Sequence, residues 1–269
     1  MKNALCGLLL LLLAWSAACA ADQAALRIYA MESRPISFME GGQPSGLVVE
    51  MAREVQRRIG DANRIEVVPW ARANLLAQKE PNVLLLSIIR TPERDRYLRT
   101  IGPVFQLHMA CYALRSRAAA LRARDPSLRS LRAGARRGSV FIKLARDAGY
   151  NLKEEINGSD TAVRMLMAGR FELLLDGDEI ISGAMRRQGL APTALEVMAP
   201  LGVKDVNFAF SQGTPEAVIQ AWDAALRDMK RDGSYQAIVH RWLPEPALLP
   251  AGRQQPAKGG SNGGKERPG

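Results

Sequence analysis

The chain has 269 residues, enough for one large domain or two lobes, and its formal net charge is +10. Eight arginines lie between residues 115 and 137, but Tyr112 is their only aromatic neighbour, so a nucleic-acid site with stacking platforms is disfavoured and no nucleic-acid partner is expected. Of the three cysteines only Cys111 lies beyond the first 20 residues, which excludes an internal disulfide in the remaining chain.

Residues 1–20 are typical of a secretory signal peptide. An apolar run from Leu8 to Trp15 leads to a small-residue ending at Ala20, and the run is too short to span a bilayer. We therefore expect cleavage after Ala20 and export to the periplasm. Acylation of Cys19 as a lipoprotein is the less favoured alternative, because Ser16 stands where such signals usually have leucine.

The next segments alternate between strands and helices. Strands are predicted at 26–31, 64–70 and 82–89, and helices at 47–59 and 71–80. The first helix has its apolar residues near a helical period and meets a C-cap glycine at its end. This order predicts a parallel sheet with right-handed crossovers.

The same alternation returns after a strand at 108–114. It gives strands at 131–138, 151–157, 171–177 and 195–200, and helices at 139–150, 159–170 and 178–189. An extended stretch at 205–212 and two helices at 215–233 and 234–243 follow. The composition of residues 244–269, rich in proline, glycine and charge, predicts a disordered tail.

The usual residues of enzyme and metal sites do not occur in recognisable patterns. The histidines, His108 and His240, have no serine or cysteine nucleophile elbow or metal-ligand spacing beside them. The acidic cluster at 176–179 lacks the Asp/Asn ladder and distal glutamate of a calcium loop. We expect no catalytic residue, no metal and no cofactor.

The turn "SIIRTPERDRY" at 87–97 is the first candidate binding site. The Thr-Pro pair at 91–92 predicts a helix start. Capping does not explain Arg94, because a cation in the first helical turn opposes the helix dipole unless an anion is near. Glu93 or Asp95 could supply that anion. So could a bound carboxylate, held bidentately by the guanidinium group.

The order and spacing of several motifs resemble those of a known family. The motifs are "P-x-S-F-M-E-x-G-Q-P-x-G", "V-P-W-A-R-A", "S-I-I-R-T-P-E-R", "R-R-G-S" and "A-G-R-F-E-L-L-L-D". From Leu26 to Leu243 the chain resembles the type II periplasmic solute-binding proteins, family 3, the polar amino acid-binding proteins of ABC transport systems.

The resemblance implies an α/β fold of two Rossmann-like lobes joined by a two-stranded hinge. Lobe 1 would comprise residues 21–107 plus 208–243, and lobe 2 residues 108–207. The ligand would bind between the lobes at the carboxyl ends of the strands, and hinge closure would bury it.

The resemblance also implies roles for individual residues. Thr91 and Arg94 match the turn that grips the ligand α-carboxylate, and Gly138 and Ser139 match the group that meets the carboxylate from the other lobe. The aspartate that binds an α-ammonium group falls, by count, on Gly177.

Residues on either side of that position offer a replacement for the missing aspartate. Asp176 or Asp178 could bind the ammonium group after a one-residue slip. If neither faces the ligand, the ligand lacks an ammonium group.

Five further residues are weaker candidates for ligand contact. Trp70 could form an aromatic platform or simply be a half-buried residue at a strand end. Arg72 and Glu32 could contact ligand or lie on the surface. Ser87 and Ile89 line the same turn as Arg94.

These observations predict an exported, monomeric solute-binding protein. It would capture a small carboxylate-bearing ligand, an amino acid or a related polar solute, and deliver it to the membrane permease of an ABC transporter. One alternative is a periplasmic enzyme that uses Glu32, Asp176 or Asp178 as a base. Another is a sensor or partner-binding protein on the same scaffold.

Overall fold

The computed structural model describes residues 25–243, so the expected signal peptide and C-terminal tail lie outside the described residues. Most strands of this part of the chain join one mixed sheet in the order β4-β1-β5-β10-β6-β9-β7-β8. Its strands are β1 (Arg27–Ala30), β4 (Ile65–Val67), β5 (Val83–Ile89), β6 (Leu98–Leu114), β7 (Arg132–Arg136), β8 (Asn151–Ile156), β9 (Leu173–Gly177) and β10 (Leu195–Ser211). A separate hairpin pairs β2 (Phe38–Glu40) with β3 (Gln43–Ser45).

Helices cover both faces of the sheet. The α-helices of the described residues are α2 (Leu47–Ile59), α3 (Trp70–Lys79), α4 (Arg115–Arg124), α5 (Val140–Asp147), α6 (Ser159–Met167), α7 (Asp178–Arg187), α8 (Glu216–Asp232) and α9 (Ser234–Trp242). Two short 3-10 turns, η1 (Arg94–Arg96) and η2 (Pro192–Ala194), complete them.

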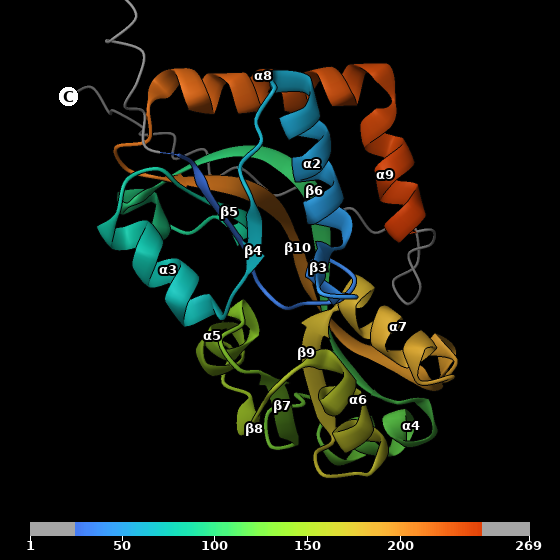
Figure 1. Ribbon diagram of the computed structural model, residues 1–269. Coiled ribbons are helices and arrows are strands. Elements are labelled where there is room, and N and C mark those ends of the chain that lie inside the picture. Colours follow the sequence, from blue (N-terminus) through green and yellow to red (C-terminus); the bar gives the residue numbers. More distant parts are fainter. Residues whose placement is uncertain (1–24, 244–269) are drawn as a thin grey trace, which may run out of the picture.

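The sheet divides into two parallel groups of strands. In the first lobe β1 pairs in parallel with β4 and β5, and α2, α3, α8 and α9 pack around these strands. In the second lobe β7 pairs in parallel with β8 and β9, and α4 to α7 surround them. Figure 1 shows the two groups one above the other. This mixed α/β architecture is the one expected, while the domain boundaries at 107 and 207 stay predictions.

Two long antiparallel strands, β6 and β10, connect the lobes (Figure 1). Their pairing runs from Leu98 and Ser211 in the first lobe to Leu114 and Leu195 in the second, with three register shifts on the way. We expected short separate strands here, at 108–114, 195–200 and 205–212. These segments do fall in β6 and β10 to within one residue, but the strands are longer than expected. The glycines and prolines that suggest breaks are accommodated as irregularities in the pairing.

The core of the first lobe follows the alternation of its strands. Leu84 and Leu86 of β5 face α2 and α8, whereas Val83 and Leu85 face α3 on the other side. Helix α2 buries its apolar stripe and ends at Gly60, whose φ of 72° provides the left-handed C-cap. The predicted and observed bounds of this helix agree.

Two local predictions differ from the structure. The Thr-Pro pair at 91–92 is followed only by the short 3-10 turn η1 and not by an α-helix, because the chain enters β6 within a few residues. Helix α4 was not predicted, since its run of arginine and alanine buries only Ala118 and Leu121 and therefore lacks a clear apolar stripe.

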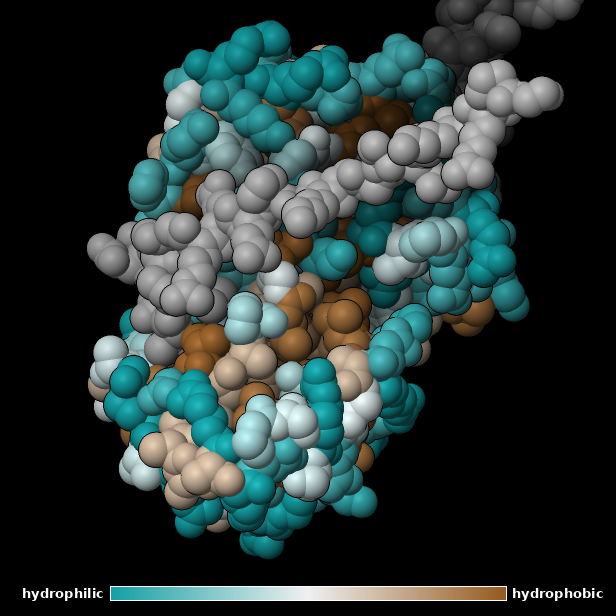
Figure 2. Space-filling view, turned by 180° about the vertical axis from the view of Figure 1, so that it is seen from behind, coloured by the Kyte–Doolittle hydropathy of each residue, from teal (hydrophilic) through white to brown (hydrophobic). Residues whose placement is uncertain are grey.

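The surface seen in Figure 2 is largely hydrophilic at its rim, with apolar side chains gathered near the middle of the view. The large apolar side chains exposed among the described residues are Met39, Leu75, Met167 and Val203. Within residues 25–243 no helix is both long and apolar enough to cross a membrane.

Candidate functional site

A pocket of about 450 Å³ lies between the two lobes. Its walls come from α3 and η1 of the first lobe and from the β7–α5 connection, α5 and β8 of the second. The residues that line it are Trp70, Arg94, Gly138, Ser139, Ile142, Lys143, Arg146, Asp147 and Glu155. The structure thus brings together four of the residues expected from the sequence, which are more than 40 positions apart across the lobes.

Arg94 is the cation of the first-lobe wall. Its Nη1 donates to the carbonyl oxygen of Ile89 at 2.7 Å, and its guanidinium carbon lies 4.7 Å from the centre of the Trp70 ring. The Thr91 hydroxyl accepts a hydrogen bond from the Arg94 backbone N–H at 3.3 Å. Burial lowers the pKa of Arg94 from its ordinary value. Within residues 25–243, no carboxylate lies within ion-pair distance of this guanidinium group.

Gly138 and Ser139 form the opposite wall, at the N-terminus of α5. Gly138 has a φ of 71°, and a Cβ placed on it would lie 3.6 Å from Cδ1 of Trp70. The Ser139 hydroxyl donates to the Arg136 carbonyl at 2.5 Å and does not cap α5. The first N–H groups of a helix have no intrahelical acceptor, so this wall can receive an anion.

The remaining charges of the pocket are paired within the second lobe. Lys143 binds Asp147 at 2.6 Å, and Arg146 binds Glu155 at 2.6 Å. Both pairs are largely exposed and therefore contribute little to stability. With Arg94 included, the lining has three cations and two carboxylates, and it carries one net positive charge.

Asp176, one of the two expected ammonium partners, is fully buried and engaged elsewhere. The Arg136 guanidinium donates to its two carboxylate oxygens at 2.5 and 3.0 Å, and the Gly177 N–H donates to the same carboxylate at 2.8 Å. Arg136 also reaches Ser33 of the first lobe, with 3.4 Å between Nη1 and Oγ. The carboxylate is thus saturated by neighbours within the protein.

Asp178 is also buried, with 1% of its surface exposed. It begins α7, and the Tyr112 hydroxyl donates to it at 3.4 Å. Burial and the neighbouring acids raise the pKa of Tyr112 well above its ordinary value. Neither Asp176 nor Asp178 lines the pocket between the lobes.

A side chain at Gly177, between these aspartates, would meet the side chain of Leu107. A Cβ at this position would lie 2.5 Å from Cδ1 and 3.2 Å from Cγ of Leu107. Leu107 lies in β6 and is itself buried. An apolar side chain of the hinge strand therefore fills the volume in which a residue at 177 would project.

The other expected residues take separate places. Ile89 contributes its carbonyl oxygen to Arg94, and Ser87 lies partly buried in β5. Arg72 is exposed on α3. Glu32 is exposed, and its carboxylate accepts the Met39 N–H at 3.1 Å. None of these four side chains is part of the pocket lining.

Sequence reasoning did not find Arg136 or Leu107. One signal could have indicated Arg136, because a cation at the end of a buried strand needs an acidic partner nearby. Lys143 and Arg146 were also missed, since their places in the pocket depend on the approach of α5 to the first lobe. Leu107 could not be identified from the sequence, because an apolar residue in a strand is ordinary.

Two residues outside the pocket, His108 and Cys111, have chemically reactive side chains, and the structure shows how each is held. His108 in β6 contacts Glu179 through Nδ1 at 2.6 Å, and this hydrogen bond raises the pKa of His108. Burial raises the pKa of the Cys111 thiol to about 12, which makes this sulfur a poor nucleophile. Among residues 25–243, no group of three or more His, Cys, Asp or Glu is placed to hold a metal ion.

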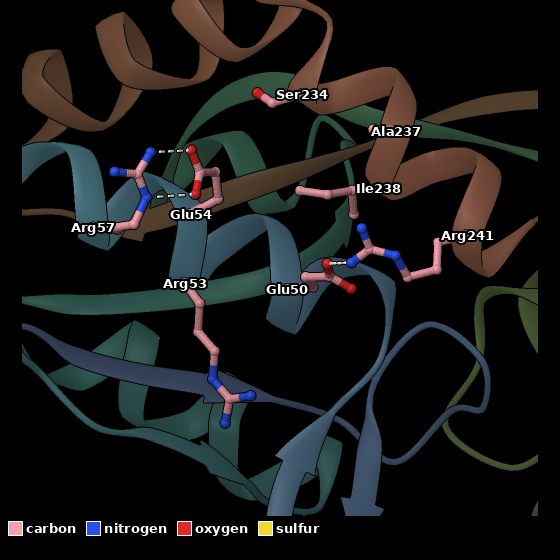
Figure 3. Close-up of a pocket in the computed structure, with 8 residues that line it drawn as sticks. All are labelled: Glu50, Arg53, Glu54, Arg57, Ser234, Ala237, Ile238 and Arg241. Carbon is pink, nitrogen blue, oxygen red and sulfur yellow. Dashed lines mark hydrogen bonds and ion pairs between the residues drawn. The ribbon is translucent and has the colours of Figure 1, made fainter.

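A second hollow, of about 370 Å³, lies between α2 and α9 of the first lobe (Figure 3). Arg241 and the Trp242 indole N–H both donate to Glu50, and Arg57 donates to both carboxylate oxygens of Glu54. Hydrogen bonding by Arg57 lowers the pKa of Glu54 to about 2. The two contacts to Glu50 fasten α9 to α2, whereas the Arg57–Glu54 pair lies within α2.

Comparison with solved structures supports the fold. The chain is 21% identical to "a histidine kinase sensor domain with similarity to periplasmic binding proteins", with a TM-score of 0.68 over 85% of this chain and 100% of that chain. It is 20% identical to an ancestral arginine-binding protein bound to arginine, with a TM-score of 0.63 over 82% and 99% of the two chains.

A third solved structure is an ancestral amino acid-binding protein described as a precursor of cyclohexadienyl dehydratase. It shares 16% identity, with a TM-score of 0.65 over 81% of this chain and 95% of that one. No curated protein matches the sequence. Residues 26–245 match the family described as "Bacterial extracellular solute-binding proteins, family 3". The chain therefore belongs to the family 3 bacterial extracellular solute-binding proteins.

Proposed function

We propose that this protein captures a small carboxylate-bearing solute between its lobes and delivers it to the permease of an ABC importer. The observation that carries this proposal is the position of Arg94. It is a partly buried guanidinium group with no carboxylate partner within ion-pair distance among residues 25–243, and it faces a helix N-terminus across an interlobe pocket. A carboxylate would satisfy both groups at once.

The alternative of an enzyme is less well supported by the same geometry. A general base must reach the bound substrate. Asp176 is saturated by Arg136, Asp178 is buried beside Tyr112, and Glu32 binds a backbone N–H outside the pocket. Binding followed by closure of the lobes requires none of these groups to be available.

A thermal-shift screen of the protein without residues 1–20 tests the proposal. The panel contains amino acids, mono- and dicarboxylic acids, and polyamines as cationic controls. A ligand at 100 times its dissociation constant stabilises the folded state by about 2.7 kcal/mol, which is roughly 5–10 °C for a chain of this size. Stabilisation by at least one carboxylate is the expected result. The proposal is contradicted if no carboxylate raises the melting temperature, or if polyamines alone do so.

A further inference from the structure

We propose that the ligand is a carboxylic acid that lacks an α-ammonium group, such as a 2-oxo acid, a 2-hydroxy acid or a simple organic acid. This inference rests on the proposed function, because it concerns the same pocket. It departs from what membership of an amino acid-binding group would suggest. Three observations carry it: the net charge of the pocket, the state of the buried acids and the packing at Gly177.

The charge of the pocket favours an anion over a zwitterion. Each lining carboxylate is bound to a cation of the same wall, Asp147 by Lys143 and Glu155 by Arg146. Arg94 is the lining cation without such a partner among the described residues. A ligand with one net negative charge neutralises the lining, whereas a zwitterion also brings an ammonium group, for which the described lining has no unpaired carboxylate.

The buried acids near the hinge, Asp176 and Asp178, are not available as the carboxylate that a ligand ammonium group would need. Asp176 accepts two hydrogen bonds from Arg136 and one from the Gly177 N–H, and its side chain is 0% exposed. Asp178 is likewise enclosed. An ammonium group would have to displace Arg136 from a bidentate buried pair, which is strongly unfavourable because it leaves a guanidinium group without its partner.

The packing at Gly177 is the third observation. Leu107 occupies the space that any side chain at this position would enter, since an added Cβ would lie only 2.5 Å from Leu107 Cδ1. At the end of β9 an apolar side chain of β6 therefore fills the volume in which the resemblance places an acidic side chain. An ammonium group placed there would lose its hydration without gaining a hydrogen bond.

Matched ligand pairs test the inference on the wild-type protein. Isothermal titration compares each amino acid with the 2-oxo and 2-hydroxy acids of the same side chain, for example L-glutamate with 2-oxoglutarate and L-leucine with 4-methyl-2-oxopentanoate. Simple mono- and dicarboxylates complete the panel. We expect the tightest ligand to lack an ammonium group and to bind at least about tenfold more tightly than the amino acid with the same side chain. If no amino acid has that side chain, the ligand should bind at least about tenfold more tightly than any amino acid of the panel.

The outcomes separate this inference from the proposed function. An amino acid that binds as tightly as its 2-oxo counterpart, or more tightly, overturns the inference and leaves solute capture intact. Absence of binding by every carboxylate overturns both.

A double variant sharpens the test. Replacing Leu107→Ala together with Gly177→Asp removes the obstructing side chain and supplies an open carboxylate at the end of β9. We expect the ratio of the two affinities to move at least about tenfold toward the amino acid. An unchanged ratio in a folded double variant contradicts the assigned role of Leu107 and Gly177. If this variant does not fold, the titrations of the wild-type protein still test whether the pocket prefers ligands without an ammonium group.

Discussion

Two arginines at the edges of the interlobe cleft show how one residue type serves two purposes. Arg136 ends β7 and is bound bidentately to the buried Asp176. Arg94 follows β5 and has a carbonyl oxygen and an indole ring as its neighbours. The first guanidinium group is satisfied within the protein and holds the second lobe together. The second retains donors for an external partner.

Removal of Arg136 gives the largest expected effect. Arg136→Met leaves the Asp176 carboxylate buried without its counter-ion, so we expect the free energy of unfolding to fall by about 3–5 kcal/mol. Urea denaturation followed by circular dichroism measures this loss. The double variant Arg136→Met with Asp176→Leu removes both charges, and we expect it to recover most of the stability. A loss below about 1 kcal/mol in the single variant would mean that the pair is not structurally important.

Removal of Arg94 is expected to change binding and spare the fold. Arg94→Ala should weaken the best carboxylate ligand by at least about thirtyfold, or about 2 kcal/mol, because a charged hydrogen-bonding partner is lost. Isothermal titration measures the affinity, and urea denaturation should show a change in stability below about 1 kcal/mol. Unchanged affinity would contradict the proposal that Arg94 binds the ligand carboxylate.

His108 gives a smaller, pH-dependent effect. Its folded-state pKa is raised by the hydrogen bond to Glu179, with Asp178 also nearby. The resulting stabilisation is full below the unfolded pKa of about 6.5 and is lost as pH rises through the folded pKa. About a third of the ring is exposed, so we expect a contribution below about 1 kcal/mol.

The measurement compares thermal unfolding of the wild type and His108→Gln between about pH 6 and pH 8. Wild-type stability relative to the variant should decline toward the higher pH. A relative stability that rises with pH would contradict the assigned effect of Glu179.

Arg90 should give the smallest effect and is the matched control for Arg94. It lies in the same turn but is exposed and paired with Asp95 at 2.8 Å. Exposed ion pairs contribute little to stability, so we expect Arg90→Ala to leave the urea midpoint nearly unchanged and to change ligand affinity by less than about twofold. Isothermal titration measures the affinity, and urea denaturation measures the stability. A large loss of affinity here would show that the turn acts through its overall positive charge.

Much of the fold could be predicted because its signals are local. The apolar period of residues 47–59 and the glycine that follows define α2, and the alternation of strands and helices indicates the parallel groups of the sheet. The full length of β6 and β10 could not be predicted, because glycines and prolines within them are tolerated only through pairing between distant segments. Helix α4 was missed because it buries so few side chains.

The candidate site was predictable only in part for the same reason. Arg94, Trp70, Gly138 and Ser139 could be identified by motif, and the structure places all four around one pocket. The engagement of Asp176 could not be foreseen, because its partner Arg136 lies 40 positions away and on another strand. Burial and steric exclusion are properties of the packed chain, and they decide what the acids near the hinge can bind.

The two paired strands that join the lobes also constrain how the molecule can move. Hydrogen bonds along β6 and β10 hold these strands in register, so the connection behaves as a ribbon that twists and bends more easily than it stretches or slides. We therefore expect the proposed closure of the lobes to be close to a rotation with one degree of freedom. A single pair of spectroscopic labels, one on α3 and one on α5, would report the whole opening coordinate.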